Sequence, residues 1–240
     1  MPNPKLAVAI ALRRLVHRAG FDVVREDFSY RFAYALPARG IRTVLDIGAN
    51  VGQFGVDLRR AKYTGAILSV EPLGSAYREL QRQAAADPTW TTVRAAVSDA
   101  PGTLTMNVSA NSVSSSVLPM RGEHTSAAPE ARYVATEEVP ATTVDELVAG
   151  YALDPASTLL KIDVQGYEKA VLAGAADTLG KFAGVRTELS LTPLYDGQAL
   201  MGEVMALLDG HGFELWLLER GFTDPQSRRL LQMDGTFFRR

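Results

Sequence analysis

The chain has 240 residues, of which 47% are hydrophobic and 22% are charged, and its formal net charge is −2. This composition is that of an ordinary folded protein with room for one large domain, and the charge argues against a nucleic-acid partner. The sequence contains no cysteine, which excludes disulfides and thiolate metal sites and fits a cytoplasmic protein.

The first predicted element is an amphipathic helix over residues 4–19. Its apolar run, residues 6–12, has basic flanks and is too short to cross a bilayer, which takes about 20 residues. We expect residues 1–40 to form a helical segment that packs on the domain or caps its active site. Pairing with a second subunit as a homodimer and weak association with a membrane surface are the alternatives, and integral membrane contact is not expected.

Strand and helix patterns then alternate along the chain. The predicted strands cover residues 43–47, 66–70, 91–97, 103–108, 158–163, 184–190, 213–219 and 229–238. The predicted helices cover residues 52–61, 74–86, 143–150, 166–179 and 198–210. This alternation predicts an α/β fold, with a mostly parallel sheet between helices on both faces. The last two strands are joined without a helix pattern, so they pair most easily as an antiparallel hairpin.

The first strand runs into a glycine-punctuated turn within residues 43–52, as a nucleotide-binding domain begins. In the register of the dinucleotide fingerprint that starts at Gly48, Asn50 replaces the middle glycine and Gln53 replaces the last. Asn50 tolerates a left-handed backbone, so the turn is kept, but close approach to a pyrophosphate is disfavoured. Asp46 would also repel a phosphate. S-adenosylmethionine, with ribose hydroxyls and a positive group, suits such a site better.

A second acidic residue, Glu71, ends the next strand together with Pro72. It follows Asp46 by 25 positions, near the spacing of about 20 expected for an acid that binds ribose hydroxyls. Nicotinamide-binding domains use a similar acid, so Glu71 alone does not identify the cofactor. A solvated charge at a strand end is the structural alternative.

Residues 109–136 interrupt the alternation of strand and helix patterns, because they are rich in Ser, Ala, Pro and Gly. Long loops in compact domains are usually lids, binding loops or disordered insertions. We expect a loop insertion here, either hanging over the ligand crevice or simply solvated. It contains His124, the histidine best placed to reach the site. His17 is expected on the surface of the N-terminal helix, and His211 in a Gly-His-Gly turn.

The chemistry is predicted at the ends of two later strands. Asp163 follows an apolar strand, and Glu188 lies at a matching height on the next strand, about 4.8 Å away in a sheet. The two carboxylates could act as a general base for a hydroxyl, or hold a divalent ion such as Mg²⁺. In the structural alternative, Lys161 or Arg186 merely neutralises a strand end. Glu168, on the following helix, could contact the substrate or favour the helix N-terminus.

Taken together, these segments resemble the FkbM-type methyltransferases over residues from about 40 to the C-terminus. The most specific motif is Leu160-Lys161-Ile162-Asp163-Val164-Gln165-Gly166-Tyr167-Glu168. The others, in chain order, are Val44-Leu45-Asp46-Ile47-Gly48-Ala49-Asn50-Val51-Gly52, Glu71-Pro72, Ala96-Val97-Ser98-Asp99 and Glu188-Leu189-Ser190. The resemblance implies a class I methyltransferase (Rossmann-like) three-layer sandwich over residues 41–240, with a seven-stranded, mostly parallel sheet whose last strand is antiparallel.

The resemblance also implies a site for S-adenosylmethionine. Its cofactor-binding residues would be Asp46, Gly48, Asn50, Gly52, Gln53, Glu71, Pro72, Ser98 and Asp99. Glu71 would bind the ribose, and Ser98 and Asp99, with Val97, would lie near the adenine. Asp163 and Glu188 are the expected catalytic residues and the expected ligands of any metal ion.

The implied activity is O-methylation of a small-molecule or oligosaccharide acceptor: a sugar, a glycolipid, a polysaccharide precursor or a related natural product. Three alternatives stay open. A nicotinamide-dependent oxidoreductase is disfavoured by the missing glycines at positions 50 and 53. A nucleic-acid methyltransferase would favour a basic face and an aromatic-proline motif where this chain has Asp163-Val164-Gln165-Gly166. A protein that binds the cofactor without catalysis is the third.

Overall fold

The computed structural model describes residues 16, 18 and 28–240. Except for Val16 and Arg18, the helix predicted over residues 4–19 lies outside the described residues. The first continuous helix in the described residues is α2 (Phe28–Ala38).

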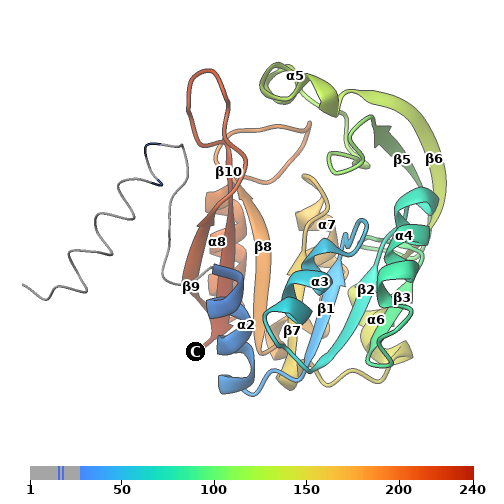
Figure 1. Ribbon diagram of the computed structural model, residues 1–240, viewed down its shortest axis with the longest axis vertical. Coiled ribbons are helices and arrows are strands. Elements are labelled where there is room, and N and C mark those ends of the chain that lie inside the picture. The colour runs from blue at the N-terminus through green and yellow to red at the C-terminus, as the bar shows by residue number, and fades with distance from the viewer. Residues whose placement is uncertain (1–15, 17, 19–27) are drawn as a thin grey trace, which may run out of the picture.

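One seven-stranded sheet forms the centre of the molecule, with strand order β3-β2-β1-β7-β8-β10-β9 (Figure 1). The strands are β1 (Thr43–Ile47), β2 (Ala66–Val70), β3 (Trp90–Val93), β7 (Thr158–Ile162), β8 (Gly184–Ser190), β9 (Phe213–Arg220) and β10 (Gln232–Arg239). Strands β1, β2, β3, β7 and β8 pair in parallel, whereas β10 is antiparallel to both of its neighbours. The predicted α/β fold, mostly parallel with an antiparallel last strand, is confirmed.

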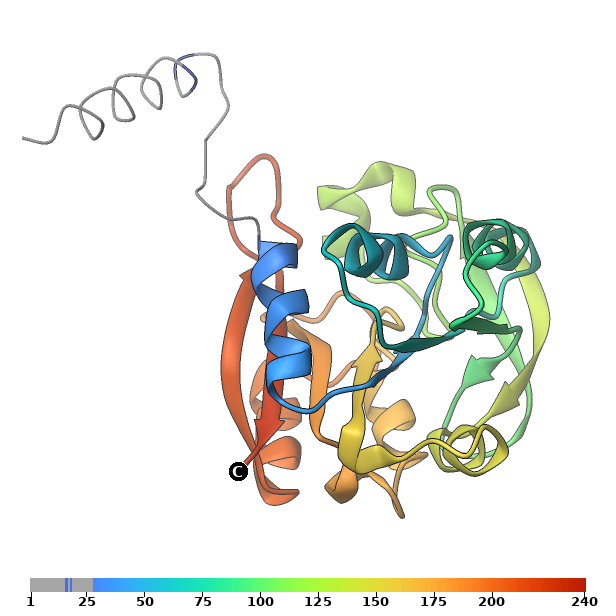
Figure 2. The same cartoon turned by 60° about the horizontal axis from the view of Figure 1, so that its bottom comes forward.

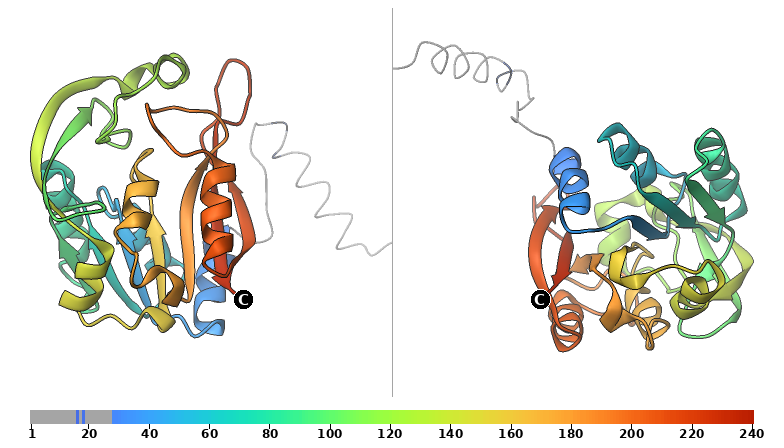
Figure 3. Two further views of the ribbon diagram at one scale, coloured as in Figure 1. Left: turned by 180° about the vertical axis from the view of Figure 1, so that it is seen from behind. Right: turned by 90° about the horizontal axis from the view of Figure 1, so that it is seen from below.

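Helices cover both faces of this sheet (Figures 1 and 3). Alternation along β1 sends Val44 towards α2, α3 (Gln53–Arg60) and α4 (Gly74–Ala84), and sends Leu45 towards α6 (Val144–Gly150), α7 (Glu168–Ala173) and α8 (Met201–Gly210). Figure 2 shows α2 lying against β9 and β10, where Phe32 shares a core with Phe238. Within the described part of the chain, no helix is both long and apolar enough to cross a bilayer.

A second, three-stranded sheet departs from the sequence prediction. It consists of β4 (Ala96–Val97), β5 (Gly102–Ser109) and β6 (Tyr133–Thr142), in the order β4-β6-β5. The strand predicted over residues 91–97 is therefore two strands in different sheets. Strand β6 was not predicted: residues 133–136 fall in the predicted loop and residues 137–142 were assigned to no element, because the strand is largely exposed and carries Pro140. Figure 1 shows β6 rising beside α4 towards helix α5 (Gly122–Ala127).

Helix α7 is shorter than the predicted span of residues 166–179. Gly166 has a φ of 96°, which keeps it out of the helix. At the other end, a Cβ on Gly174 would lie 2.0 Å from the carbonyl oxygen of Ser98, so only glycine allows the chains to pass so closely. Helix α7 thus ends where it packs against the segment that follows β4.

Candidate active site

A cavity of about 500 Å³ lies at the carboxyl ends of the parallel strands. Its lining includes the turn that follows β1, the residues that follow β2 and β7, and parts of β8 and β10. Residues 111–115, between β5 and α5, also line it. The position is the one at which open α/β sheets bind their ligands.

The turn after β1 brings backbone to the cavity wall. Gly48 and Asn50 have φ values of 73° and 48° and line the cavity with Gln53. A Cβ on Gly48 would lie 1.8 Å from the carbonyl oxygen of Asp163, so glycine is required here by close packing of two strand ends. Gly52, predicted beside the cofactor, does not line the cavity. It faces the side chains of Leu80 and Trp90 instead.

Glu71 lies at the cavity wall with only 5% of its surface exposed. Its Oε2 accepts a hydrogen bond of 2.8 Å from the backbone N–H of Asn50, and its Oε1 accepts one of 3.0 Å from Leu73. Burial raises the pKa of Glu71 to about 7, although these two N–H groups oppose the shift. Pro72 lines the same wall. Glu71 is thus a fixed, buried carboxyl group at a ligand cavity, which contradicts the alternative of a solvated strand-end charge.

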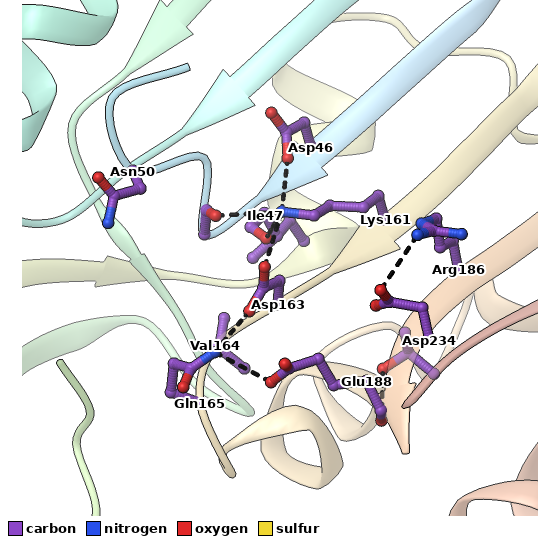
Figure 4. Close-up of polar contacts among 12 residues, drawn as sticks. Asp46, Ile47, Asn50, Lys161, Asp163, Val164, Gln165, Arg186, Glu188 and Asp234 are labelled. Carbon is purple, nitrogen blue, oxygen red and sulfur yellow. Dashed lines mark hydrogen bonds and ion pairs between the residues drawn. The ribbon is translucent and has the colours of Figure 1, made fainter. Parts of the chain in front are cut away.

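Asp46 is fully buried behind the cavity rather than on its wall. Ser69 donates a hydrogen bond of 3.0 Å to its Oδ2, and the Nζ of Lys161 lies 3.0 Å from its Oδ1 (Figure 4). Burial alone would lower the pKa of Lys161, but the carboxylates of Asp46 and Asp163 raise it overall. Lys161 is therefore charged, and it also donates to the carbonyl oxygen of Gly48, 3.1 Å away. The role of Asp46 is to hold this lysine beneath the turn.

Asp163 and Glu188 both line the cavity, and one amide group joins them (Figure 4). Gln165 donates from Nε2 to Asp163 Oδ1 at 2.8 Å and to Glu188 Oε2 at 3.0 Å. Gln232 of β10 also donates to Glu188, at 3.3 Å. Burial and the nearby charge of Asp163 raise the pKa of Glu188 well above its usual range. The two strand ends therefore bring the predicted pair together, but through a glutamine that the sequence analysis did not single out.

Lys161 and Arg186 are both engaged in ion pairs near this carboxylate pair. Lys161 lies 3.6 Å from Asp163. Arg186 lies 2.6 Å from Glu219 and 3.2 Å from Asp234, so its ion-pair partners come from β9 and β10 rather than from the pair itself. Asp234 lines the cavity but sits in a C-terminal strand without a recognisable motif, so it could not be predicted from the sequence.

The segment predicted near the adenine is split by the structure. Val97 lines the cavity, whereas Ser98 and Asp99 do not. Ser98 is 2% exposed, donates a hydrogen bond of 2.9 Å to Asp99, and lies 3.1 Å from the hydroxyl of Tyr167. Tyr167 itself lines the cavity. Ser98 thus contacts a cavity residue without reaching the cavity.

Glu168 is buried, and its carboxyl group accepts hydrogen bonds from the backbone. It accepts hydrogen bonds from the N–H groups of Val164, at 3.3 Å, and Gly166, at 3.1 Å. Burial raises its pKa to about 7. Glu168 therefore stabilises the turn between β7 and α7, and it does not line the cavity.

His124 of α5 lines the cavity and is 3% exposed. Its ring meets Tyr195 edge-on at 5.1 Å between centroids and lies 5.3 Å from Phe222. Its Nδ1 is buried without a hydrogen-bond partner among the described residues. Burial lowers the pKa of His124, so the ring is neutral near pH 7. His211 is exposed and bonds to the carbonyl oxygen of Leu207, while His17 lies outside the described residues.

The predicted metal role of Asp163 and Glu188 is not supported. In the described part of the chain, no group of three or more His, Asp or Glu side chains is arranged to hold a metal ion. Gln165 contributes an NH₂ group between the two carboxylates, and a donor cannot ligate a cation. The residues present therefore fit an amide-bridged carboxyl pair rather than a Mg²⁺ site.

Comparison with known proteins gives a family and a general structural likeness. The family model described as "Methyltransferase FkbM domain" matches residues 46–215. No curated protein sequence matches the chain. A TehB-like SAM-dependent methyltransferase from Corynebacterium glutamicum is 13% identical, with a TM-score of 0.42 over 99% of this chain and 100% of its own. Magnesium protoporphyrin IX methyltransferase from Synechocystis, solved with bound SAM, is 11% identical, with a TM-score of 0.49 over 97% and 82%. Neither structure bears on the substrate.

Proposed function

Because the chain belongs to the FkbM family of S-adenosylmethionine-dependent methyltransferases, as its motifs predicted, we propose that it methylates a hydroxyl group of a sugar, glycolipid, polysaccharide precursor or related natural product. The observation that supports this proposal best is the carboxyl pair Asp163–Glu188 in the same cavity as Glu71. Glu71 can accept hydrogen bonds from the ribose hydroxyls of the cofactor. Asp163 and Glu188 can accept hydrogen bonds from the hydroxyl of the molecule to be methylated.

The cofactor-binding part of the cavity would comprise Glu71 and the turn after β1. When bound, the cofactor supplies a methyl group made electrophilic by its positive sulfur. Glu71 would accept hydrogen bonds from the ribose hydroxyls, in addition to the two backbone bonds that fix it. Gly48 and Asn50 would leave the backbone open to the methionine portion, since their left-handed conformations turn the chain sharply at the wall.

For transfer of that methyl group to an acceptor hydroxyl, with S-adenosylhomocysteine as the leaving group, Asp163 would accept the hydroxyl proton. Glu188 is the weaker candidate for the base, because its raised pKa favours the protonated form. It would orient the hydroxyl instead. The remaining contribution is positioning of two reactants in one cavity.

The charges around the cavity favour a neutral acceptor. Among the described residues that line it, the Lys and Arg side chains are Lys161 and Arg186, and each is already paired with carboxylates. A phosphate or carboxylate beside the reacting hydroxyl would therefore meet acidic groups without a spare cation. We expect unphosphorylated sugars to be methylated in preference to their phosphate esters.

Calorimetric titration with S-adenosylhomocysteine, with NAD in parallel, tests the cofactor. Binding of the homocysteine compound alone is expected, and binding of NAD alone would overturn the proposal. Neutral sugars and glycolipid headgroups are then screened for methyl transfer, with EDTA in a parallel arm. Activity unaffected by EDTA is expected, whereas loss that Mg²⁺ restores would bring back the metal hypothesis.

The catalytic assignment is tested by Asp163→Asn. We expect turnover to fall about 10²- to 10⁴-fold, the usual contribution of a general base, while S-adenosylhomocysteine affinity stays within a few-fold. Asp177→Asn, at an exposed position after α7, is the control and should leave both unchanged. Undiminished turnover in Asp163→Asn would remove the proposed base. Cofactor binding without turnover of any acceptor would favour a protein that binds the cofactor without catalysis.

A further inference from the structure

The amide of Gln165 occupies an unusual position, because a single NH₂ group serves two carboxyl groups. Its Nε2 donates one hydrogen bond of 2.8 Å to Asp163 Oδ1 and another of 3.0 Å to Glu188 Oε2. Two carboxylates brought this close repel each other, and an amide that donates to both offsets part of that repulsion. The distance between the two acidic groups is therefore set by a third side chain.

The direction of this amide is fixed from its other end. The hydroxyl of Tyr195 donates to Gln165 Oε1 at 3.0 Å and also lies 3.2 Å from the carbonyl oxygen of Ser114. The amide turns its NH₂ to the carboxyl pair, so the two oxygens that face the hydroxyl are both acceptors and the tyrosine is the donor. Burial raises the pKa of Tyr195, which keeps its proton in place. If the amide were rotated by 180°, its oxygen would face two carboxyl oxygens and its NH₂ would face the tyrosine. Both hydrogen bonds to the carboxyl pair would then be lost.

The backbone of Gln165 is held in a conformation that a non-glycine residue rarely adopts. Its φ is 55°, and the next residue, Gly166, has a φ of 96°. A left-handed conformation costs a non-glycine residue about 1–2 kcal/mol. Ser116 donates a hydrogen bond of 2.7 Å to the Gln165 carbonyl oxygen, and Tyr195 packs against Gly166. Residues from the segment between β5 and α5 thus help to hold the glutamine where its amide meets the carboxyl pair.

We propose that Gln165 is a positioning residue that sets the spacing and ionisation of Asp163 and Glu188, and that Tyr195 fixes its amide and links it to residues 114–116. Only the predicted effect on turnover rests on the methyl-transfer function proposed above. The arrangement of the pair is testable in the protein alone. In the described part of the chain, Tyr195 makes no hydrogen bond to either carboxyl group, so its hydroxyl reaches the pair through the glutamine.

The first test follows the carboxyl groups by NMR. Protein labelled with ¹³C at its Asp and Glu carboxyl groups is titrated without ligand, with signals assigned through Asp163→Asn and Glu188→Gln. Gln165→Met keeps the size of the side chain but removes both hydrogen bonds. We expect the apparent pKa values of the pair to rise by about one unit in Gln165→Met. Tyr195→Phe should give a smaller rise of the same sign.

Tyr77→Phe is the control. Tyr77 of α4 also directs its hydroxyl at a carbonyl oxygen, that of Thr92 at 3.5 Å, and it does not line the cavity. We expect its titration to match the unchanged protein. Unshifted pKa values in Gln165→Met would overturn the positioning role. Equal behaviour of Tyr195→Phe and Tyr77→Phe would overturn the part assigned to Tyr195.

Turnover supplies the second test, using an acceptor found in the screen. Tyr195→Phe should lower kcat about tenfold and leave KM for S-adenosylmethionine within twofold, whereas Tyr77→Phe should change neither. A rise in KM with kcat unchanged would contradict the proposal. If the screen yields no acceptor, the proposed function fails on that result while the carboxyl titration still decides the role of Gln165.

Discussion

Asp46 and Lys161 form an almost completely buried ion pair, with side chains 0% and 8% exposed. The lysine joins this pair to Asp163 and to the turn after β1, so one cation organises three parts of the site. Removing one partner of a buried pair leaves the other charge uncompensated, which is far costlier than losing a surface pair.

We therefore expect Lys161→Met to lower the free energy of unfolding by about 3–5 kcal/mol. Urea denaturation measures this loss. Arg42→Met is the control, because Arg42 and Asp154 form an exposed pair at 3.2 Å and should contribute at most about 1 kcal/mol. Equal losses in the two variants would contradict the structural role of Lys161.

We expect Glu71 to make cofactor binding sensitive to pH. Its pKa of about 7 means that the carboxyl group is mostly protonated below neutrality and ionised above it. Only the ionised form can accept from both ribose hydroxyls. We expect the affinity for S-adenosylhomocysteine to rise roughly tenfold from pH 6 to pH 8, following the fraction of ionised Glu71.

Isothermal titration at several pH values measures this dependence. Glu71→Gln should bind more weakly than the unchanged protein and should show a flat profile over the same range, because its amide does not titrate. A profile in Glu71→Gln as steep as that of the unchanged protein would assign the pH dependence to another group.

At single positions, the sequence predicted residue types better than residue roles. Glu71, Asp163 and Glu188 lie on the cavity as expected, because a carboxylate at a strand end points to one edge of the sheet. Asp46 sits one residue before the end of β1, so its side chain turns inwards to Lys161 instead. Gln165 could not be recognised, since its role depends on a tyrosine 30 residues away in the sequence.

Among the elements, helix α3 depends on a glycine where it crosses β3. A Cβ on Gly55 would lie 2.2 Å from the ring of Trp90. Trp90 in turn donates a hydrogen bond of 3.0 Å to Ser69, which donates to Asp46. The packing of this helix therefore reaches the buried ion pair through two hydrogen bonds.

Gly55→Ala should consequently destabilise the protein by about 1–3 kcal/mol, the usual cost of overpacking a filled core. Gly202→Ala in α8 is a matched control, because the added Cβ meets nothing within 4 Å. There we expect a small gain of about 0.5 kcal/mol from higher helix propensity. Thermal unfolding of both variants measures the difference, and a neutral Gly55→Ala would show that α3 can shift away from Trp90.

The elements that the sequence predicted best were the buried ones. Strands β1, β2 and β8 have the predicted bounds, and nearly all of their residues are buried, as in strands covered on both faces. The second sheet was missed, since β6 is mostly exposed and its pairing with β4 and β5 is set by tertiary structure. The same tertiary contacts place α5 and residues 111–115 at the cavity, which the loop prediction left open.

At the scale of the whole molecule, residues 110–132 form a cap over the carboxyl ends of the sheet. Apart from the buried contact between Tyr195 and Ser114, the hydrogen bonds and ion pairs that join this cap to the segment that follows β8 gather around Arg121 and Asp196. Arg121 forms an exposed ion pair of 3.0 Å with Asp196, its N–H donates to the carbonyl oxygen of Leu194, and Asp196 donates to that of Pro119. We therefore expect the cap to open independently of the central sheet.

Hydrogen exchange measured by mass spectrometry tests this. Arg121→Ala should speed exchange in residues 110–132 roughly two- to fivefold, which corresponds to the loss of an exposed ion pair, without changing β7. Arg132→Ala, at an exposed position at the end of the cap, should leave both unchanged. Faster exchange throughout the sheet in Arg121→Ala would mean that cap and sheet open as one unit.

The antiparallel position of β10 has a consequence for how the protein is made. Strand β10 lies between β8 and β9, both of which leave the ribosome earlier. Until residues 232–239 emerge, β9 has no neighbour in the sheet, and Gln232 and Asp234 are missing from the cavity. The nascent chain can therefore assemble the side of the cavity that carries Glu71 first, but the wall that carries Glu188 is finished only by β10, which is synthesised after both of its neighbours.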